Sequence, residues 1–282
     1  MLRRIDSLNY PFDGPVPEAS RALERDGHCI LRGVFTPAEV AALRTEILAV
    51  YERVPPEMRA SAITPEVGAM YRYQMFNHSP LSQQAMGRAA ILDVLEPLLG
   101  EGLHVISCTA WRNPPGPVLT PHGVQWHIDG GPHVPRAEGT PWPEHIAYPV
   151  FVVGCHVYLQ DVALTDGPTA CIPGSHRSGR VPPFDRRLDD GLAYAGRTAV
   201  QHVVAAGDVD LRVSDVWHRR WPPADTARGR LFLQVNYARR DIAQRVLPTD
   251  VVNHTTAAAR ERARTARERC LLGLHPQSYF DA

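Results

Sequence analysis

A histidine and an aspartate stand two positions apart in the run Val-Gln-Trp-His-Ile-Asp at residues 124–129, directly before a pair of glycines. Side chains at positions i and i+2 of a strand project from the same face, so His127 and Asp129 would present an imidazole and a carboxylate side by side. These are two of the three ligands of a 2-His-1-carboxylate site, which binds Fe(II) and leaves the opposite positions open. The structural alternative is a strand end in which Asp129 caps the turn at the glycines.

A second histidine ligand has to come from another part of the chain, and His218 is the best candidate. It follows the segment 211–217, which begins as a strand after a turn at residues 207 and 208. The end of a strand near the mouth of a barrel is a suitable place for a metal ligand. Four other histidines of this region are alternative ligands, although none has a carboxylate at strand spacing: His122, His133, His145 and His176.

Two arginines follow in the segment 228–236, in which polar and apolar residues largely alternate. The alternation predicts one shared face for Arg228, Arg230, Gln234 and Asn236. A guanidinium inside a barrel is costly unless it is paired, and it is suited to bind the distal carboxylate of a dicarboxylate in bidentate fashion. The alternative is that both arginines are edge-strand charges that discourage aggregation.

Composition and charge favour a small-molecule partner. The 282 residues include 30 Lys+Arg and 30 Asp+Glu, so no net charge attracts the chain to nucleic acid or to an anionic membrane. The five scattered cysteines lack a CxxC pair, which argues against a disulfide framework and a thiolate zinc site. No segment approaches the roughly 18 apolar residues of a membrane span. We therefore expect a cytoplasmic protein, monomeric or homodimeric, with no nucleic-acid or membrane partner.

The rest of the sequence predicts a β-rich core between helices. Helices are predicted at 18–26, at 81–99 and at 255–272. A further helix is predicted to begin directly after Thr36, which forms a capping box with Glu39. Strands are predicted at 28–35, 103–111, 124–129, 149–159, 169–172, 200–204, 208–213 and 230–237. This spacing is typical of a sandwich or barrel, and its long interruptions, 130–147 and 174–199, have the length of lids or binding loops.

One domain over residues 1–282 accounts for this pattern. We expect a helical N-terminal part at about 15–100, a β core at about 103–238 and a C-terminal helix at about 255–272. No internal repeat and no linker divides the chain.

Several segments together resemble the phytanoyl-CoA dioxygenase family of Fe(II)/2-oxoglutarate oxygenases. The segment LERDGHCILRGVFTPAEVAALRTEI looks like the family's opening helix, strand and helix, and WHID matches its metal-binding HxD motif. DGPTACIPGSHRSG, residues 166–179, matches its Pro-Gly-Ser-His stretch, and VWHRRWPPADTARGRLFLQVNY matches its distal histidine and arginine strand. The resemblance runs from about residue 20 to about residue 240.

The resemblance implies a double-stranded β-helix, which is a cupin-like jelly-roll barrel with an all-β core and flanking helices. It also implies Fe(II) bound by His127, Asp129 and His218, with 2-oxoglutarate as co-substrate and O₂ as oxidant. Arg228 falls near the position of the family's co-substrate arginine, and Arg230 is the second choice. The same comparison places His156 and Thr109 at further 2-oxoglutarate positions.

The resemblance further implies hydroxylation of an unactivated C–H bond in a small metabolite, in bacterial specialised biosynthesis. Halogenating relatives have Gly or Ala where this chain has Asp129. One departure is Arg220, which stands where the family commonly carries a small hydroxyl residue, and which moves a positive charge toward the site. The alternatives are a metal-dependent cupin-like enzyme that does not use 2-oxoglutarate and a non-catalytic jelly-roll binding protein.

Candidate substrate contacts come from three segments, one of which is 174–199. The loop 130–147 contributes His133 and Trp142, and the segment 70–76 contributes Arg72, Tyr73 and Phe76. Aromatic rings beside Arg72 suit an anionic or zwitterionic ligand. The alternative is that these aromatic residues pack a loop.

Overall fold

The structure, a computed structural model, describes residues 16–56, 65–117, 123–242 and 255–275. The α-helices are α1 (Glu18–Asp26), α2 (Pro37–Arg53), α3 (Pro65–Ala69), α4 (Met75–His78), α5 (Pro80–Met86), α6 (Ala89–Leu99), α7 (Ala257–Arg262) and α8 (Ala266–Leu271). Short 3₁₀ helices span Leu164–Asp166, Ser175–Ser178 and Phe184–Arg186. The strands are β1 (His28–Leu31), β2 (Tyr71–Arg72), β3 (His104–Asn113), β4 (Val152–Tyr158), β5 (Thr169–Cys171), β6 (Val200–Gln201), β7 (Val209–Val213), β8 (His218–Arg220) and β9 (Arg230–Ala238).

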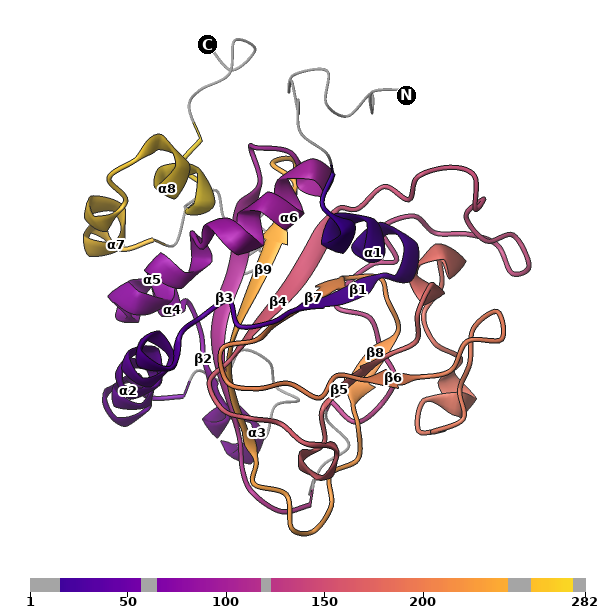
Figure 1. Ribbon diagram of the computed structural model, residues 1–282, viewed down its shortest axis with the longest axis horizontal. Coiled ribbons are helices and arrows are strands. Elements are labelled where there is room, and N and C mark those ends of the chain that lie inside the picture. Colours follow the sequence, from indigo (N-terminus) through magenta and orange to yellow (C-terminus); the bar gives the residue numbers. More distant parts are fainter. Residues whose placement is uncertain (1–15, 57–64, 118–122, 243–254, 276–282) are drawn as a thin grey trace.

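The strands form two antiparallel sheets. The large sheet has the order β1-β7-β4-β9-β3-β2, and the small sheet has the order β6-β5-β8. Helices α2, α5 and α6 lie along one side of the large sheet, and the small sheet lies on its other side (Figure 1). Among the described residues the two sheets do not close into one hydrogen-bonded barrel. None of the described helices is long and apolar enough to cross a bilayer.

The helix-facing side of the large sheet is apolar. Leu211 of β7 and Val235 of β9 are buried in one cluster with Ile47 of α2 and Leu95 of α6. Burying each such side chain contributes about 1.5–3 kcal/mol to folding. This cluster is the main core, and it holds the helices against the sheet.

The opposite side of the large sheet is polar and faces the small sheet. Thr109, Gln234, His156 and Asp210 stand directly opposite one another on β3, β9, β4 and β7, so their side chains share this side. All four are buried. We call them the polar row; its side chains lie on the side of the large sheet that faces the small sheet.

Two predicted helices are each divided in two. The predicted helix at 81–99 ends at Met86 and begins again at Ala89, because Arg88 has an extended backbone, with φ −60° and ψ 118°. The predicted helix at 255–272 is broken before Thr265, which begins α8 with a capping box to Glu268. A capping side chain satisfies the free N–H groups of a new helix start, so it favours a break over continuation. The capping box of Thr36 and Glu39 at the start of α2 is confirmed.

The predicted strand at 124–129 is wrong as a regular element. Only His127 makes a strand-like pairing, and it does so with His218. The neighbouring N–H groups bond elsewhere, Trp126 to the carbonyl of Arg187 and Asp129 to the carbonyl of Ser214. The segment is therefore fixed by bonds to three different parts of the chain. Strands β2 and β8 were not among the sequence predictions.

The loop at 130–147 is fastened to the core through Asp215. The buried Asp215 carboxylate accepts hydrogen bonds from the backbone N–H of His133 at 3.1 Å and from the Tyr148 hydroxyl at 2.7 Å. His133 Nδ1 lies 2.6 Å from the same carboxylate. Burial, followed by the charge of Asp215, raises the pKa of the Tyr148 phenol well above its usual value, so this hydroxyl remains a donor.

The Asp215→Ala variant should lower the free energy of unfolding by about 1–3 kcal/mol, because it leaves the hydroxyl of buried Tyr148 and the N–H of half-buried His133 without their acceptor. Urea unfolding followed by tryptophan fluorescence measures the change. Asp185→Ala removes an exposed carboxylate and is the matched control. Equal unfolding midpoints for the two variants would contradict this role of Asp215.

Candidate active site

Backbone pairing brings the two predicted histidine ligands together. The N–H of His127 donates to the carbonyl of His218 at 2.9 Å, and the N–H of His218 donates to the carbonyl of His127 at 3.0 Å. The N–H of Asp129 donates to the carbonyl of Ser214 at 3.0 Å, which holds the third side chain on the same side. The predicted trio therefore meets in space, although His127 and Asp129 are not part of a regular strand.

The ligand atoms of the three residues converge. Asp129 Oδ1 lies 3.4 Å from His218 Nε2 and 3.9 Å from His127 Nε2. One donor atom from each residue falls within 4.8 Å of the others. Donor atoms at about 2 Å from one metal ion lie no more than about 4 Å apart, so the separations of 3.4 and 3.9 Å are compatible with a shared ion.

Backbone carbonyls orient both imidazole rings. Nδ1 of His127 lies 2.7 Å from the carbonyl of Gln125, and Nδ1 of His218 lies 2.9 Å from the carbonyl of Val216. Each Nδ1 therefore carries the proton, and each Nε2 offers its lone pair to the site. Such bonds from the second ring nitrogen are usual for metal-ligating histidines.

The protonation states also suit a cation. Burial, assisted by the neighbouring His218, lowers the pKa of His127 to about 4, so its ring is neutral at pH 7. Burial alone would raise the pKa of Asp129, but His218, His127 and Arg212 outweigh it and hold this pKa well below its usual range. A neutral imidazole and an ionised carboxylate are the forms that bind metals. The residues present thus fit a divalent metal ion.

A buried charge network lies behind the metal-binding residues. Asp210 of the polar row accepts a hydrogen bond from Arg212 Nη1 at 2.9 Å, and its other oxygen lies 3.0 Å from His202 Nδ1. Burial alone would lower the pKa of His202, but Asp210 raises it to about 10. This network links the large sheet to the segment after β6. The sequence signal for it was the alternation Asp208, Asp210, Arg212 in a buried strand, and the sequence prediction did not use it.

The two predicted co-substrate arginines point to different places. Arg228 lies at the surface with its side chain 59% exposed, and its guanidinium pairs with Asp166 at 2.6 Å. Arg230, the first residue of β9, is buried, donates from Nε to Asn113 Oδ1 at 3.0 Å and lies over the ring of Phe232. The hydrogen bond from Arg228, the largest effect, lowers the pKa of Asp166 to about 2. Only Arg230 of this pair reaches the interior.

His156 and Thr109, the other predicted 2-oxoglutarate contacts, lie in the polar row on either side of Gln234. The ring of His156 packs against Phe232, with centroids 4.3 Å apart, and its Nε2 lies 3.0 Å from Arg212 Nη2. Burial and then the charge of Arg212 hold the pKa of His156 well below its usual value, so the ring is neutral. Both residues face the interior.

The predicted substrate residues have varied surroundings. Phe76 is part of the helix-facing core, and Arg72 lies over the ring of Tyr51 and donates to backbone carbonyls, so packing accounts for both. Tyr73 is half-buried beside Tyr71. The remaining two residues belong to the fastened loop: His133 bonds to Asp215 and Trp142 packs against Tyr148.

The alternative histidine ligands that the structure describes do not join the cluster of His127, Asp129 and His218. His133 is held by Asp215, and His176 is buried with Nε2 3.0 Å from the carbonyl of Glu24. His145 is exposed in the loop at 130–147, and His122 lies outside the described residues. Among the described residues, the one metal-type cluster of three or more ligands is His127, Asp129 and His218.

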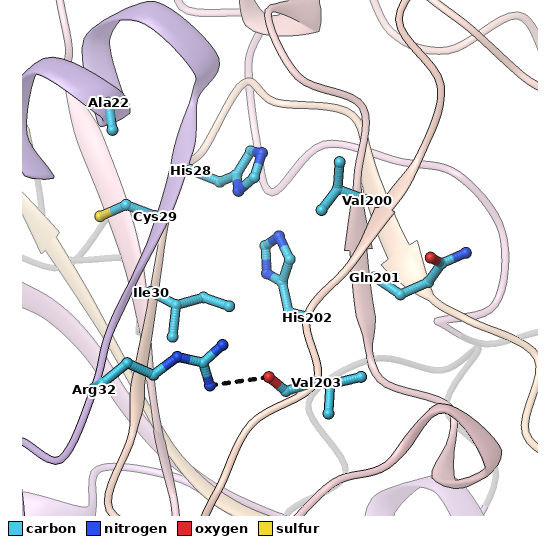
Figure 2. Close-up of a pocket in the computed structure, with 9 residues that line it drawn as sticks. All are labelled: Ala22, His28, Cys29, Ile30, Arg32, Val200, Gln201, His202 and Val203. Atoms are coloured by element: carbon cyan, nitrogen blue, oxygen red, sulfur yellow. Dashed lines mark hydrogen bonds between the residues drawn. The ribbon is translucent and has the colours of Figure 1, made fainter.

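A separate pocket of about 430 Å³ opens between the edges of the two sheets. Figure 2 shows the rings of His28 and His202 pointing toward one another across it, with a hydrogen bond from Arg32 to the carbonyl of Val203 at one end. The ring centroids of His28 and His202 are 4.6 Å apart. None of the three metal-type residues lines this pocket. Through His202 its wall is connected to Asp210 and the buried charge network.

Solved structures with similar folds include complexes with 2-oxo acids, one of them also with Fe3+. EctD from S. alaskensis, solved with 2-oxoglutarate and 5-hydroxyectoine, has a TM-score of 0.62 and 21% identity over 82% of this chain and 78% of that one. The epimerase SnoN, in complex with Fe3+, alpha ketoglutarate and nogalamycin RO, has a TM-score of 0.57 and 18% identity over 79% of this chain and 83% of that one. These likenesses confirm the jelly-roll fold.

The sequence comparisons agree with the fold. Ectoine dioxygenase of Bordetella bronchiseptica is 27% identical over 163 residues, which are 56% of this chain and 48% of the relative, so the chain spans about half the length of that relative. The family model described as phytanoyl-CoA dioxygenase (PhyH) matches residues 23–220. Because this match extends over well more than half of the chain and includes the converging trio, the protein belongs to the phytanoyl-CoA dioxygenase family.

Proposed function

We propose that this protein is an Fe(II)/2-oxoglutarate-dependent oxygenase that hydroxylates an unactivated C–H bond of a small metabolite, in bacterial specialised biosynthesis. The observation that carries the proposal is the convergence of two Nε2 atoms and one carboxylate oxygen beside an interior rich in buried arginine. Membership of the family supports the reaction class. The metabolite itself is not specified by these residues.

The three converging residues would hold the metal ion that activates O₂. Fe(II) bound by His127, Asp129 and His218 would supply O₂ activation coupled to oxidative decarboxylation of 2-oxoglutarate to succinate and CO₂. Asp129 contributes the negative charge that an imidazole lacks. The carbonyls bonded to the two Nδ1 atoms keep the rings from turning, so the ligand set is preorganised. The loop at 130–147, which follows Asp129 directly, would limit the access of water from one side once a substrate is bound.

Hydroxylation is the outcome that the ligand set favours. A carboxylate at position 129 occupies the place that halogenating relatives leave open for a halide. The similar proteins are described as a dioxygenase and an epimerase, so the same fold supports more than one outcome on the substrate. The position of the target C–H bond relative to the metal decides among them.

Arg230, rather than Arg228, is the arginine for the distal carboxylate of 2-oxoglutarate. Arg230 is buried and its Nη1 has no hydrogen-bond partner among the described residues, whereas Arg228 is already neutralised by Asp166 at the surface. An unpaired buried guanidinium is costly, and a carboxylate relieves that cost. Thr109 and His156 lie along the same interior wall and complete the proposed co-substrate contacts.

Anaerobic titration of the protein with Fe(II) and 2-oxoglutarate tests the function directly. The expected result is a weak visible charge-transfer band, followed in air by 2-oxoglutarate-dependent formation of succinate. Turnover of a metabolite extract, followed by mass spectrometry, then searches for the substrate. Metal-dependent turnover without 2-oxoglutarate would favour a cupin-like enzyme instead, and metal binding without any turnover would favour a binding protein.

Replacing the carboxylate ligand should abolish the metal centre. Loss of a residue that only supports a metal ligand lowers affinity or activity about 10–100-fold. Asp129 is a proposed ligand itself, so Asp129→Ala should weaken Fe(II) binding and succinate formation by more than about 100-fold. Equilibrium dialysis and a succinate assay measure the two effects. Asp225→Ala, at an exposed position, is the control. Wild-type behaviour of Asp129→Ala would show that the trio is not the metal centre.

Substitutions of Arg230 and of Arg228 should affect the apparent Kd for 2-oxoglutarate to very different extents. Arg230→Met removes a charge-assisted hydrogen bond worth about 1.5–3 kcal/mol and should raise the apparent Kd for 2-oxoglutarate about 10- to 100-fold. Arg228→Met should change it less than about twofold, since that side chain points to solvent. The anaerobic charge-transfer titration measures both. The reverse order of effects would assign the co-substrate to Arg228.

A further inference from the structure

Two arginines enter the interior from opposite sheets. Arg220 is the last residue of β8 in the small sheet, and Arg230 is the first residue of β9 in the large sheet. Only 9% of Arg220 and 5% of Arg230 is exposed to solvent. Long cationic side chains are rarely this buried unless they are paired with an acid.

The register of the sheets places both guanidiniums beside one contact between the sheets. Thr169, which stands opposite Arg220, has its Oγ1 3.0 Å from the hydroxyl of Tyr158. Tyr158 stands opposite Phe232, whose ring lies 5.4 Å from the Cζ atom of Arg230. The two arginines therefore flank the same Tyr–Thr contact.

Neither guanidinium has an acid of its own among the described residues. Arg220 Nη2 donates to the backbone carbonyl of Asp166 at 3.2 Å, and Arg230 Nε donates to the amide oxygen of Asn113. Nε of Arg220 and Nη1 of Arg230 are buried without a hydrogen-bond partner in the described chain. Both guanidiniums thus make hydrogen bonds only to neutral groups.

The nearest carboxylates are already engaged. Asp166 binds Arg228 through both of its oxygens, and it also accepts from the backbone N–H of Ala163. Asp210 is shared by Arg212 and His202. Neither acid is left to neutralise Arg220 or Arg230.

The pKa values of both arginines reflect this imbalance. Burial, followed by the charge of Arg230, lowers the pKa of Arg220 to about 9. Burial is also the largest cause that lowers the pKa of Arg230 to about 10. Like charges that share a dry interior repel one another and disfavour the protonated forms. An anion between them would reverse both effects.

Gly167 gives Arg220 its room. A Cβ at this position would lie 3.0 Å from Arg220 Nε and 2.6 Å from the carbonyl oxygen of Trp221. The backbone of Gly167 has φ +71°, a conformation that L side chains rarely adopt. A side chain at position 167 would therefore occupy the space that the Arg220 guanidinium needs.

We propose that Arg220 and Arg230 form a two-guanidinium clamp for a single carboxylate, the distal carboxylate of the 2-oxo acid co-substrate. The proposal rests on the proposed function and adds Arg220 to the co-substrate site. A carboxylate can accept about four hydrogen bonds, and one guanidinium donates at most two of them in a bidentate pair. A second guanidinium can donate the others. The clamp makes the site selective for dicarboxylic over monocarboxylic 2-oxo acids.

A binding comparison tests the clamp. The wild type, Arg220→Met, Arg220→Lys and the surface control Arg25→Met are titrated anaerobically in the presence of Fe(II), with 2-oxoglutarate and with the monocarboxylic 2-oxobutyrate. Arg220→Met should weaken 2-oxoglutarate binding about 10- to 100-fold and change 2-oxobutyrate binding less than about twofold, since 2-oxobutyrate lacks the carboxylate in question. Arg220→Lys, which keeps the charge, should recover part of the loss.

Thermal unfolding of the metal-free proteins provides a second, independent measurement. Glutarate, which has both carboxylates but no 2-oxo group, should raise the Tm of the wild type and of Arg25→Met. It should raise the Tm of Arg220→Met much less at the same glutarate concentration. Because this measurement needs neither metal nor turnover, it decides the clamp even if the oxygenase proposal fails.

The outcomes separate the two proposals. Wild-type protein that shows no spectral change with Fe(II) and 2-oxoglutarate would refute the oxygenase function, and the glutarate measurement would then decide the clamp alone. Equal 2-oxoglutarate affinity and equal glutarate stabilisation in the wild type and Arg220→Met would overturn the clamp. Equal losses for 2-oxoglutarate and 2-oxobutyrate in Arg220→Met would overturn it too, because they would indicate a general structural role for Arg220.

Discussion

The reciprocal backbone hydrogen bonds between His127 and His218 are the interaction on which the candidate site depends. They join an irregular segment to the first residue of β8, across a large distance in the chain. Closing a loop of that length costs entropy, and the rest of the fold has to supply the compensating burial. The apolar face of the large sheet does so through its contact with the helices. The metal-type cluster is thus a consequence of the whole sandwich.

The main chain, more than neighbouring side chains, sets the geometry of the trio. The carbonyls of Gln125 and Val216 hold the two imidazoles, and the carbonyl of Ser214 holds the backbone of Asp129. Such an arrangement tolerates changes in the surrounding side chains as long as the backbone path is kept. It also explains how a segment without regular secondary structure presents ligands at fixed positions, since its N–H groups bond to three separate partners.

The interior between the sheets has an excess of positive charge. Arg212 is balanced by Asp210, but Arg220 and Arg230 hydrogen-bond only to neutral groups among the described residues. Buried charge without a partner lowers stability, and folds accept that cost where a ligand supplies the partner. A carboxylate beside the two arginines would bring this part of the interior closer to neutrality. The stability of the protein and its ligand binding are therefore coupled.

Local chemistry made several features predictable from sequence. The capping box at Thr36, the helix at 18–26 and most core strands depend on neighbours in the chain, and the structure has them within a few residues. The break at Arg88 was missed because apolar spacing continues across it, and the break before Thr265 was missed because the Arg/Glu pattern continues across it. The pair His127 and Asp129 was recognisable because its chemistry is carried by residue type and short spacing.

The sequence by itself determined which residue types are available for the site: two histidines, one aspartate and a set of arginines in a fixed order. Tertiary structure alone decided which of them meet. Alternation predicted one face for Arg228 and Arg230, yet β9 begins only at Arg230, and Gly229, with φ +79°, turns the chain between them. Arg228 consequently pairs with Asp166 at the surface. The approach of Arg220 to Arg230 likewise depends on two sheets packing together, a contact that local spacing does not encode, because it is fixed by burial and register between segments distant in the chain.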